Sequence, residues 1–499
     1  MTDSRPSPFD TSGVETGADG IRRYADLPAT VTDMLRRAVD AEPAAEALVE
    51  TGTNRRLTYR QLWDAAGRVA GGLADLGVRP GDRVAIRLPN GVDWALALYG
   101  TLLAGAVAVP VNTRFTDDEA DYVVTDSGAR HVLTPAMPLP TSDPVEPVER
   151  AAAEPAALFY TSGTTGFPKG AVTTHANLVS NVESCRRVMR LGPPGAAVRT
   201  LVAVPLFHAT GCNSQLLLAA YQRGAAVVMP AFRPDLFLRA MRDERIDLSI
   251  AVPAMYALAM RHESFTPAHV SSVRVAAYGG APIAPAMVER IADAFPAAEV
   301  GNGFGLTEAT SLATYLPHAW RRHADSVGFP APVCDVRVDD PGPDGVGELL
   351  VRGPSVVAGY WNKPAETAVA FRDGWLHTGD LARIDADGLV RIVDRLKDVI
   401  IRGGENVYCV EVENALAGAP GVVESAVIGV PDDVLGEKVG VVLVAAPGDR
   451  VDVSAVLAGL RGRIADFKAP QYVAVRAEPL PRNAGGKVLK GQLRADVRW

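Results

Sequence analysis

The stretch from Leu158 to Gly170 joins an apolar strand to a loop of small and hydroxylated residues. Backbone N–H groups of such a loop can approach a phosphate, hydroxyls add hydrogen bonds, and a lysine adds positive charge. The loop residues with this chemistry are Thr161, Ser162, Gly163, Thr164, Thr165 and Lys169. Their spacing differs from the Walker loop GxxxxGK[ST]. The pattern predicts a polyphosphate site of another kind than that of ordinary P-loop ATPases.

Three further charged residues stand on short turns of small residues. Glu308 follows a glycine-rich turn and Thr307, where one carboxylate can hold Mg²⁺ and the hydroxyl can contact a phosphate. Asp380 closes an HTGD turn, which leaves its carboxylate to accept hydrogen bonds or to cap the turn. Lys487 follows Asn-Ala-Gly-Gly, a loop that can bring one cation to a site on another domain.

Eight segments in chain order resemble the adenylate-forming superfamily, which contains acyl-CoA synthetases, adenylation domains of peptide synthetases and firefly luciferase. The resemblance covers almost the whole chain and looks strongest to stand-alone acyl-CoA ligases. The segments are YTSGTTGFPKG (160–170), PLFHATG (205–211), YGGAPI (278–283), GFGLTE (303–308), GELLVRGPSVVAGYWNKPAET (347–367), WLHTGD (375–380), DRLKDVIIRGGEN (394–406) and PRNAGGKVLK (481–490).

The resemblance implies an AMP-forming acid ligase. A small-molecule carboxylic acid is expected to react with ATP to give acyl-AMP and pyrophosphate, and CoA is expected to take the acyl group. ATP, Mg²⁺ and CoA are the expected cofactors. Two alternatives stay open, because the acyl-AMP can also pass to an amine, as in an amide bond synthetase, or to a separate carrier protein. Cys409 stands where relatives commonly have proline, and the stretch from Val132 to Glu154 is short for the family.

The resemblance also assigns roles to single residues. Lys487, His208 and Glu308 are expected to be catalytic, Glu308 to be the metal ligand as well, and Lys397 to be the hinge of a domain rotation. Whether His208 acts as a base or only positions the substrate stays open. The expected nucleotide contacts are Thr161, Ser162, Gly163, Thr164, Thr165, Lys169, Gly280, Ala281, Pro282, Thr307, Asp380 and Arg395.

The elements that must position these residues predict an α/β fold. A helical pattern runs from Thr58 to Gly77, and short apolar runs alternate with further helical patterns, as in parallel sheets covered by helices. We expect a large domain over 1–396 with a β-rich subdomain at about 342–393, and a small mobile α+β domain over 397–499. The four clearest apolar runs are Leu201–Val204, Ala226–Met229, Ser249–Val252 and Val273–Ala277.

Composition excludes several classes of protein. Lys and Arg total 50 against 58 Asp and Glu, a formal net charge of −8, which has the wrong sign for a nucleic-acid partner. The charge-free stretch Trp94–Val111 suits a buried helix turning into a strand, so no membrane insertion is expected. Residues 1–20 lack an apolar targeting segment, and the four cysteines stand alone and are predicted to be reduced and buried. These features favour the cytoplasm and leave the oligomeric state open.

Overall fold

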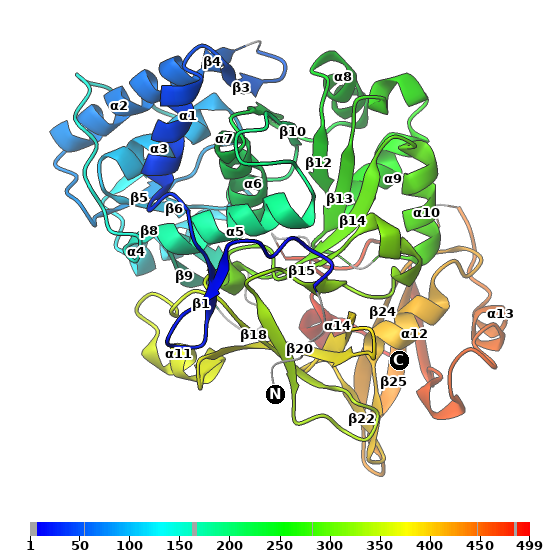
Figure 1. Cartoon of the computed structure of the whole chain (residues 1–499). Helices are drawn as coiled ribbons and strands as arrows, with labels where there is room; N and C mark the ends of the chain where they lie inside the picture. Colours follow the sequence, from blue (N-terminus) through cyan, green and yellow to red (C-terminus); the bar gives the residue numbers. More distant parts are fainter. Residues whose placement is uncertain (1–6, 54, 162–166, 282, 447, 484–486) are drawn as a thin grey trace.

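The computed structural model describes residues 7–53, 55–161, 167–281, 283–446, 448–483 and 487–499. Two large sheets with their helices form the first part of the chain (Figure 1). The elements that follow, coloured yellow-green to red, lie below them in this view and build two further five-stranded sheets. The predicted α/β class with a separate C-terminal domain is confirmed.

A nine-stranded sheet forms the larger half of the first part. Its six central strands run parallel, and antiparallel strands close both edges. The four predicted apolar strands are β10 to β13, shifted by one or two residues. In spatial order the strands are β16 (Phe329–Pro330), β15 (Thr314–Leu316), β14 (Glu299–Phe304), β13 (Val275–Gly279), β12 (Leu248–Ala251), β10 (Arg199–Val202), β11 (Ala225–Val228), β3 (Glu46–Glu50) and β4 (Arg56–Thr58).

A five-stranded sheet carries the phosphate-loop motif. Its last two strands, β8 and β9, form the antiparallel hairpin around that motif. The charge-free stretch becomes α3 (Val92–Leu103) followed by a buried strand, as predicted. Among the described residues no helix is long and apolar enough to cross a membrane. The strands in spatial order are β7 (His131–Leu133), β5 (Arg83–Ile86), β6 (Val107–Pro110), β8 (Pro155–Thr161) and β9 (Lys169–Thr174).

Helices bury both faces of the nine-stranded sheet. Neighbouring residues such as Leu201 and Val202 belong to hydrophobic clusters on opposite faces, which explains why these strands are continuously apolar. One cluster also includes α1 (Val31–Ala41), α2 (Tyr59–Asp75), α3, α5 (His175–Val188) and α7 (Leu218–Tyr221). The other includes α8 (Pro234–Asp243), α9 (Pro253–Arg261) and α10 (Pro285–Ala294), while α4 (Asp117–Ser127) covers the outer face of the five-stranded sheet.

The third sheet is antiparallel and carries the HTGD motif. The predicted turn at Asp380 is wrong, because residues 377–380 lie within strand β20 (Trp375–Ile384), although Gly379 has a positive φ of 69°. The sheet begins before the predicted start at residue 342, because its first strand is β17. The strands are β17 (Asp335–Asp339), β18 (Gly347–Arg352), β20 (Trp375–Ile384), β19 (Phe371–Arg372) and β21 (Val390–Arg395), with α11 (Pro364–Ala370) beside them.

The fourth sheet has hydrophobic clusters of its own, formed by residues from Ile400 onward. This separate core fits a small C-terminal domain; the boundaries at 396 and 397 stay predictions. All four cysteines are free and buried, as expected. The C-terminal elements are β23 (Glu405–Val407), β22 (Ile400–Arg402), β25 (Gly436–Ala445), β24 (Val422–Asp432), β26 (Tyr472–Arg476), α12 (Cys409–Leu416), α13 (Val453–Ala458) and α14 (Lys490–Asp496).

The connection between β7 and β8, residues 134–154, has no helix or strand and packs along α2. The Ser142 N–H donates to the Arg68 carbonyl at 3.0 Å. A Cβ atom added to Gly71 would lie 2.0 Å from the Asp143 carbonyl oxygen. The glycine pair Gly71-Gly72 therefore lets the connection approach the helix backbone.

Replacing Gly71 by alanine should destabilise the fold. Alanine gains about 1 kcal/mol of helix propensity, but the overlap with Asp143 costs roughly 1–3 kcal/mol, so the net loss should be about 1 kcal/mol. The matched control is Gly67→Ala, whose added Cβ would lie at an ordinary 3.4 Å from Pro144. Denaturant unfolding of both variants checks this. Equal stabilisation of the two would show that the connection does not pack on α2.

Candidate active site

The phosphate-loop motif spans the β8–β9 hairpin. Thr161 ends β8 and pairs with Lys169 at the start of β9, so the two ends of the loop lie side by side. The predicted contacts Ser162, Gly163, Thr164 and Thr165 lie outside the described residues.

A partly buried acidic residue anchors the β8 end of this loop. Asp126 on α4 accepts a hydrogen bond from the Tyr160 hydroxyl at 2.8 Å and pairs with the Lys363 ammonium at 2.6 Å. On the other side of the loop, the Phe167 ring stacks on Tyr122 with centroids 4.6 Å apart. These contacts fix the hairpin to α4 and to the segment before α11.

Glu308 lies on a single 3-10 turn, Thr307–Ala309, directly after β14. Two fully buried amides hold the following loop: Asn181 of α5 donates to the Leu312 carbonyl at 2.8 Å, and Asn213 donates to the Thr310 carbonyl at 3.1 Å. Asn213 belongs to a π-helical segment, Cys212–Leu217, a type of irregularity that often occurs at functional sites. The position of Glu308 therefore depends on side chains far away in the sequence.

Tyr360 connects Glu308 to Lys169. Its hydroxyl donates to Glu308 Oε1 at 2.7 Å, and the Lys169 ammonium lies 4.6 Å from the centroid of its ring. In the described ranges neither Lys169 nor Glu308 forms an ion pair. The two charges thus face the same region without neutralising each other.

Asp380 and Arg395 form an ion pair across β20 and β21, where the two residues are in register. Arg395 Nε lies 2.6 Å from Asp380 Oδ1. Burial raises the pKa of Asp380 to about 6, although Arg395 and then Lys487 act in the opposite direction. Its second oxygen, Oδ2, is buried and has no hydrogen-bond partner in the part of the chain that the structure describes. It is an acceptor suited to a hydroxyl donor such as a ribose.

Glu348 on β18 orders the β20 backbone before Asp380. Its Oε1 accepts the Gly379 N–H at 3.0 Å, and its Oε2 lies 2.8 Å from His377 Nδ1. The Thr378 hydroxyl donates to the Leu349 carbonyl at 2.7 Å. These hydrogen bonds hold the β20 backbone before Asp380 in place, and the Asp380 carboxylate is buried.

Lys487 reaches this region from the C-terminal domain. The Asn483 N–H donates to the Lys487 carbonyl, the Lys487 N–H donates to Asn483 Oδ1, and a bridge joins Arg482 to Val488; residues 484–486 lie outside the described residues. Although the side chain keeps some exposure, the surrounding protein lowers the pKa of Lys487, and Arg395 lowers it further. Asp380 and Glu308 raise it, so the ammonium lies close enough to interact with both.

His208 precedes a short helix, Ala209–Gly211, at the end of the segment after β10. Burial lowers the pKa of His208 to about 4, and the charges of Arg114 and Lys487 add to this effect. The imidazole is therefore neutral at neutral pH and lies near Lys487. A base and a positioning group both remain possible roles.

Of the remaining expected residues, Gly280 and Ala281 follow the carboxyl end of β13, next to the end of β14 that leads to Glu308. Gly279 and Gly303 are in register at the ends of β13 and β14, and a Cβ on Gly279 would meet the Gly303 carbonyl at 2.3 Å. Gly280 and Ala281 follow exposed, and Pro282 lies outside the described residues. Carboxyl ends of parallel strands are where α/β sheets bind ligands. Lys397 is exposed two residues after Arg395.

Cys409 does more than replace a proline at the start of α12. Its N–H donates to the buried carboxylate of Asp394, a bond that proline cannot make, and its thiol lies 3.0 Å from the Asp398 carbonyl. The departure thus ties the predicted hinge segment to the C-terminal domain.

Sequence reasoning missed three residues that shape the site: Tyr360, Glu348 and Asn181. Tyr360 and Glu348 lie inside a segment that carries the family resemblance, and that was the signal available for them. Asn181 sits in an ordinary helix and gave no signal.

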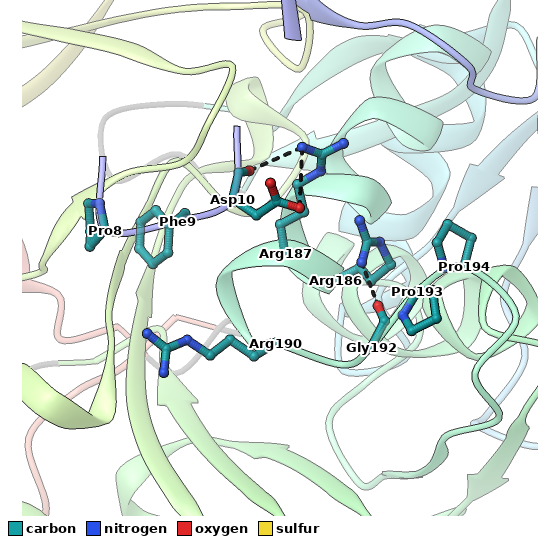
Figure 2. Close-up of a pocket in the computed structure, with 9 residues that line it drawn as sticks. All are labelled: Pro8, Phe9, Asp10, Arg186, Arg187, Arg190, Gly192, Pro193 and Pro194. Carbon is teal, nitrogen blue, oxygen red and sulfur yellow. Dashed lines mark hydrogen bonds and ion pairs between the residues drawn. The ribbon is translucent and has the colours of Figure 1, made fainter. Parts of the chain in front are cut away.

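A surface cavity of about 480 Å³ lies elsewhere, beside the C-terminal end of α5 (Figure 2). None of the expected site residues lines it. Its Arg186 and Arg187 are already paired with the buried Glu183, each at 2.6 Å, and Asp10 adds a further negative charge. These arginines stabilise the helix end, so the cavity is not the nucleotide site.

The crevice and its charges define a nucleotide-dependent enzyme, and comparison with known proteins gives the family. The model of the AMP-binding enzyme family matches residues 35–361, and that of the AMP-binding enzyme C-terminal domain matches residues 411–487. The chain belongs to the AMP-binding enzyme family.

Similar proteins align with this chain over nearly its full length. A feruloyl-CoA synthase of Amycolatopsis is 40% identical over 92% of this chain and 97% of its own. A long-chain-fatty-acid–CoA ligase of Mycobacterium tuberculosis is 35% identical over the same shares. The ATP-bound MatB of Rhodopseudomonas palustris superposes with a TM-score of 0.85 at 32% identity, covering 93% of this chain and 98% of its own.

The raised pKa of Asp380 gives a stability prediction. The folded protein binds this proton more tightly than the unfolded chain, whose value is near 3.8, so the contribution to stability is present at low pH and lost as pH rises through about 6. Asp380→Asn removes this dependence. Relative to the wild type, the variant should therefore gain about 1 kcal/mol between about pH 5 and about pH 7.5. Denaturant unfolding at both pH values measures the difference; a constant difference would contradict the raised pKa of this buried carboxylate.

Proposed function

We propose that this protein activates a carboxylic acid with ATP through an acyl-AMP and transfers the acyl group to CoA. The observation that carries the proposal is the convergence of Lys169, Glu308, Asp380 and Lys487 on one crevice. The relatives named as CoA ligases support CoA as the acceptor over an amine.

Nucleotide binding follows from the donors and acceptors of the crevice. Asp380 Oδ2 accepts hydrogen bonds from the ribose, and Arg395 keeps that carboxylate ionised and in place. The backbone at Gly280 and Ala281 contacts the adenine. Lys169 and Thr307 contact the phosphates, together with the loop residues Thr161 to Thr165.

In the first half-reaction, a carboxylate oxygen attacks the α-phosphorus, the bond to the bridging oxygen breaks, and pyrophosphate leaves. Negative charge grows on the phosphate oxygens and the leaving group, where Lys487 and Lys169 stabilise it. Mg²⁺ would be held by Glu308 and would supply further positive charge at the phosphates. Because oxide is a poor leaving group, exchanging it for AMP is what makes the acyl carbon reactive.

In the second half-reaction, the CoA sulfur attacks the acyl carbon, the bond to the AMP oxygen breaks, and the thiol proton leaves to solvent or to a nearby base. The neutral imidazole of His208 is suited to receive it or to orient the thioester. We propose that the C-terminal domain turns about Lys397 between the two steps, so that Lys487 serves the first and the Arg402–Asn406 loop serves the second.

The acid is proposed to be a monocarboxylic aryl or medium-chain acid, which matches the feruloyl-CoA synthase and the fatty-acid ligase among the relatives. Such an enzyme would act in the cytoplasm, where ATP and CoA are present. The test offers purified protein ATP, Mg²⁺ and a panel of acids, with CoA and amines side by side. We expect AMP, pyrophosphate and an acyl-CoA; ADP, or an amide as the sole product, would contradict the proposal.

Removing the C-terminal-domain lysine should separate the two half-reactions. Lys487→Ala should slow pyrophosphate release from ATP and acid by at least ~100-fold, because one charge that stabilises the transition state is lost. Consumption of pre-formed acyl-AMP with CoA should stay near the wild-type rate. The matched control is Lys438→Ala, a lysine of the same domain paired with Asp432 away from the crevice. Equal losses in both half-reactions would refute the role of Lys487.

A further inference from the structure

Tyr360 lies between two groups of opposite charge. The Lys169 ammonium lies over the face of its ring, 4.6 Å from the centroid, and Glu308 Oε1 accepts its hydroxyl at 2.7 Å. Aromatic faces attract cations and phenol hydroxyls donate to carboxylates, so both charged groups find a favourable neutral partner on one side chain.

The backbone around Tyr360 is bonded to the same two elements that carry these charges. The Trp361 N–H donates to the Gly170 carbonyl at 2.8 Å, next to Lys169 on β9. The Val357 N–H donates to the carbonyl of Glu308 itself at 2.9 Å. The segment from Val357 to Trp361 is therefore hydrogen-bonded to both β9 and the Glu308 turn, which fixes the separation between them.

The side chain of Tyr360 is held independently of its charged neighbours. The backbone N–H of Tyr360 donates to the Thr367 hydroxyl at 2.9 Å. The ring of Tyr360 contacts Phe371 edge to face, with centroids 5.6 Å apart.

Without this ring, a lysine and a glutamate facing one crevice would attract each other directly. Their ion pair would consume the positive charge that the phosphates need and the carboxylate that the metal needs. With the ring in place, Glu308 gives only Oε1 to the tyrosine, and no described residue donates to Oε2.

We propose that Tyr360 is a positioning residue that keeps Lys169 and Glu308 apart and turns one oxygen of Glu308 toward the metal–nucleotide complex. This inference rests on the proposed function, since it concerns the same ATP site. Tyr360 acts through Glu308 and Lys169, and it takes no part in bond making or breaking.

The test measures ATP binding by titration calorimetry without any acid, so that no turnover occurs. The quantity is the ratio of the ATP dissociation constant in EDTA to that in saturating Mg²⁺. Tyr360→Phe keeps the ring over Lys169 but loses the hydroxyl. It should lower this ratio by about ten-fold, the effect of one charge-assisted hydrogen bond, and leave the affinity in EDTA unchanged. An unchanged ratio would overturn the proposal.

Two further variants separate positioning from a structural role. The double variant Tyr360→Phe with Glu308→Gln should have the same ratio as Glu308→Gln alone, because the hydroxyl acts through that carboxylate. Tyr360→Leu, which also removes the ring, should in addition weaken ATP binding in EDTA, because Lys169 then pairs with Glu308. Independent, additive losses in the double variant, or unchanged binding in EDTA for Tyr360→Leu, would contradict the mechanism.

The matched control is Tyr24→Phe, which removes another buried hydroxyl, bonded to Ser184 at 3.0 Å, outside the crevice. Its ratio should equal that of the wild type; a fall there would mean that the ratio reports loss of stability. Wild-type protein that binds no ATP at all would overturn the proposed function itself, and with it this inference.

Discussion

Charged groups in this protein face one region of the fold, and several of them keep a polar atom there that no described residue pairs with. Asp380 pairs through Oδ1 with Arg395, and its buried Oδ2 has no hydrogen-bond partner among the described residues. Glu308 Oε1 accepts a hydrogen bond from the neutral Tyr360 hydroxyl, and the Lys169 ammonium lies over the face of the same ring. Such an arrangement raises the energy of the empty site, which a nucleotide and its metal would recover on binding.

The loops beside β13 and β14 and the domain that carries Lys487 have different roles in the proposed mechanism. The crevice lies where β13 and β14 end, and buried amides and the Asp126 cluster fix the loops beside it. Lys487 belongs instead to a domain with hydrophobic clusters of its own, so the proposed rotation about Lys397 would leave the large core intact. A cation delivered by a separate body can leave after one step and make room for the next.

Motif order made the family and the fold class predictable from sequence, because glycine turns, single carboxylates and apolar strands are local signals. The helical pattern that starts at Thr58 is α2, which Thr58 and Gln61 begin with a capping box, and the apolar runs are strands displaced by one or two residues. Register and bonding over long distances were not predictable. Tyr360 and Glu308 are separated by 52 positions, and nothing in either local pattern indicates that they bond.

The most direct test of the account follows an oxygen atom. If the acid attacks the α-phosphorus, one oxygen of its carboxylate must end in AMP. An acid labelled with ¹⁸O in its carboxylate, incubated with ATP, Mg²⁺ and CoA, should therefore give AMP that carries one heavy oxygen by mass spectrometry. Unlabelled AMP, or label found in inorganic phosphate beside ADP, would contradict the account.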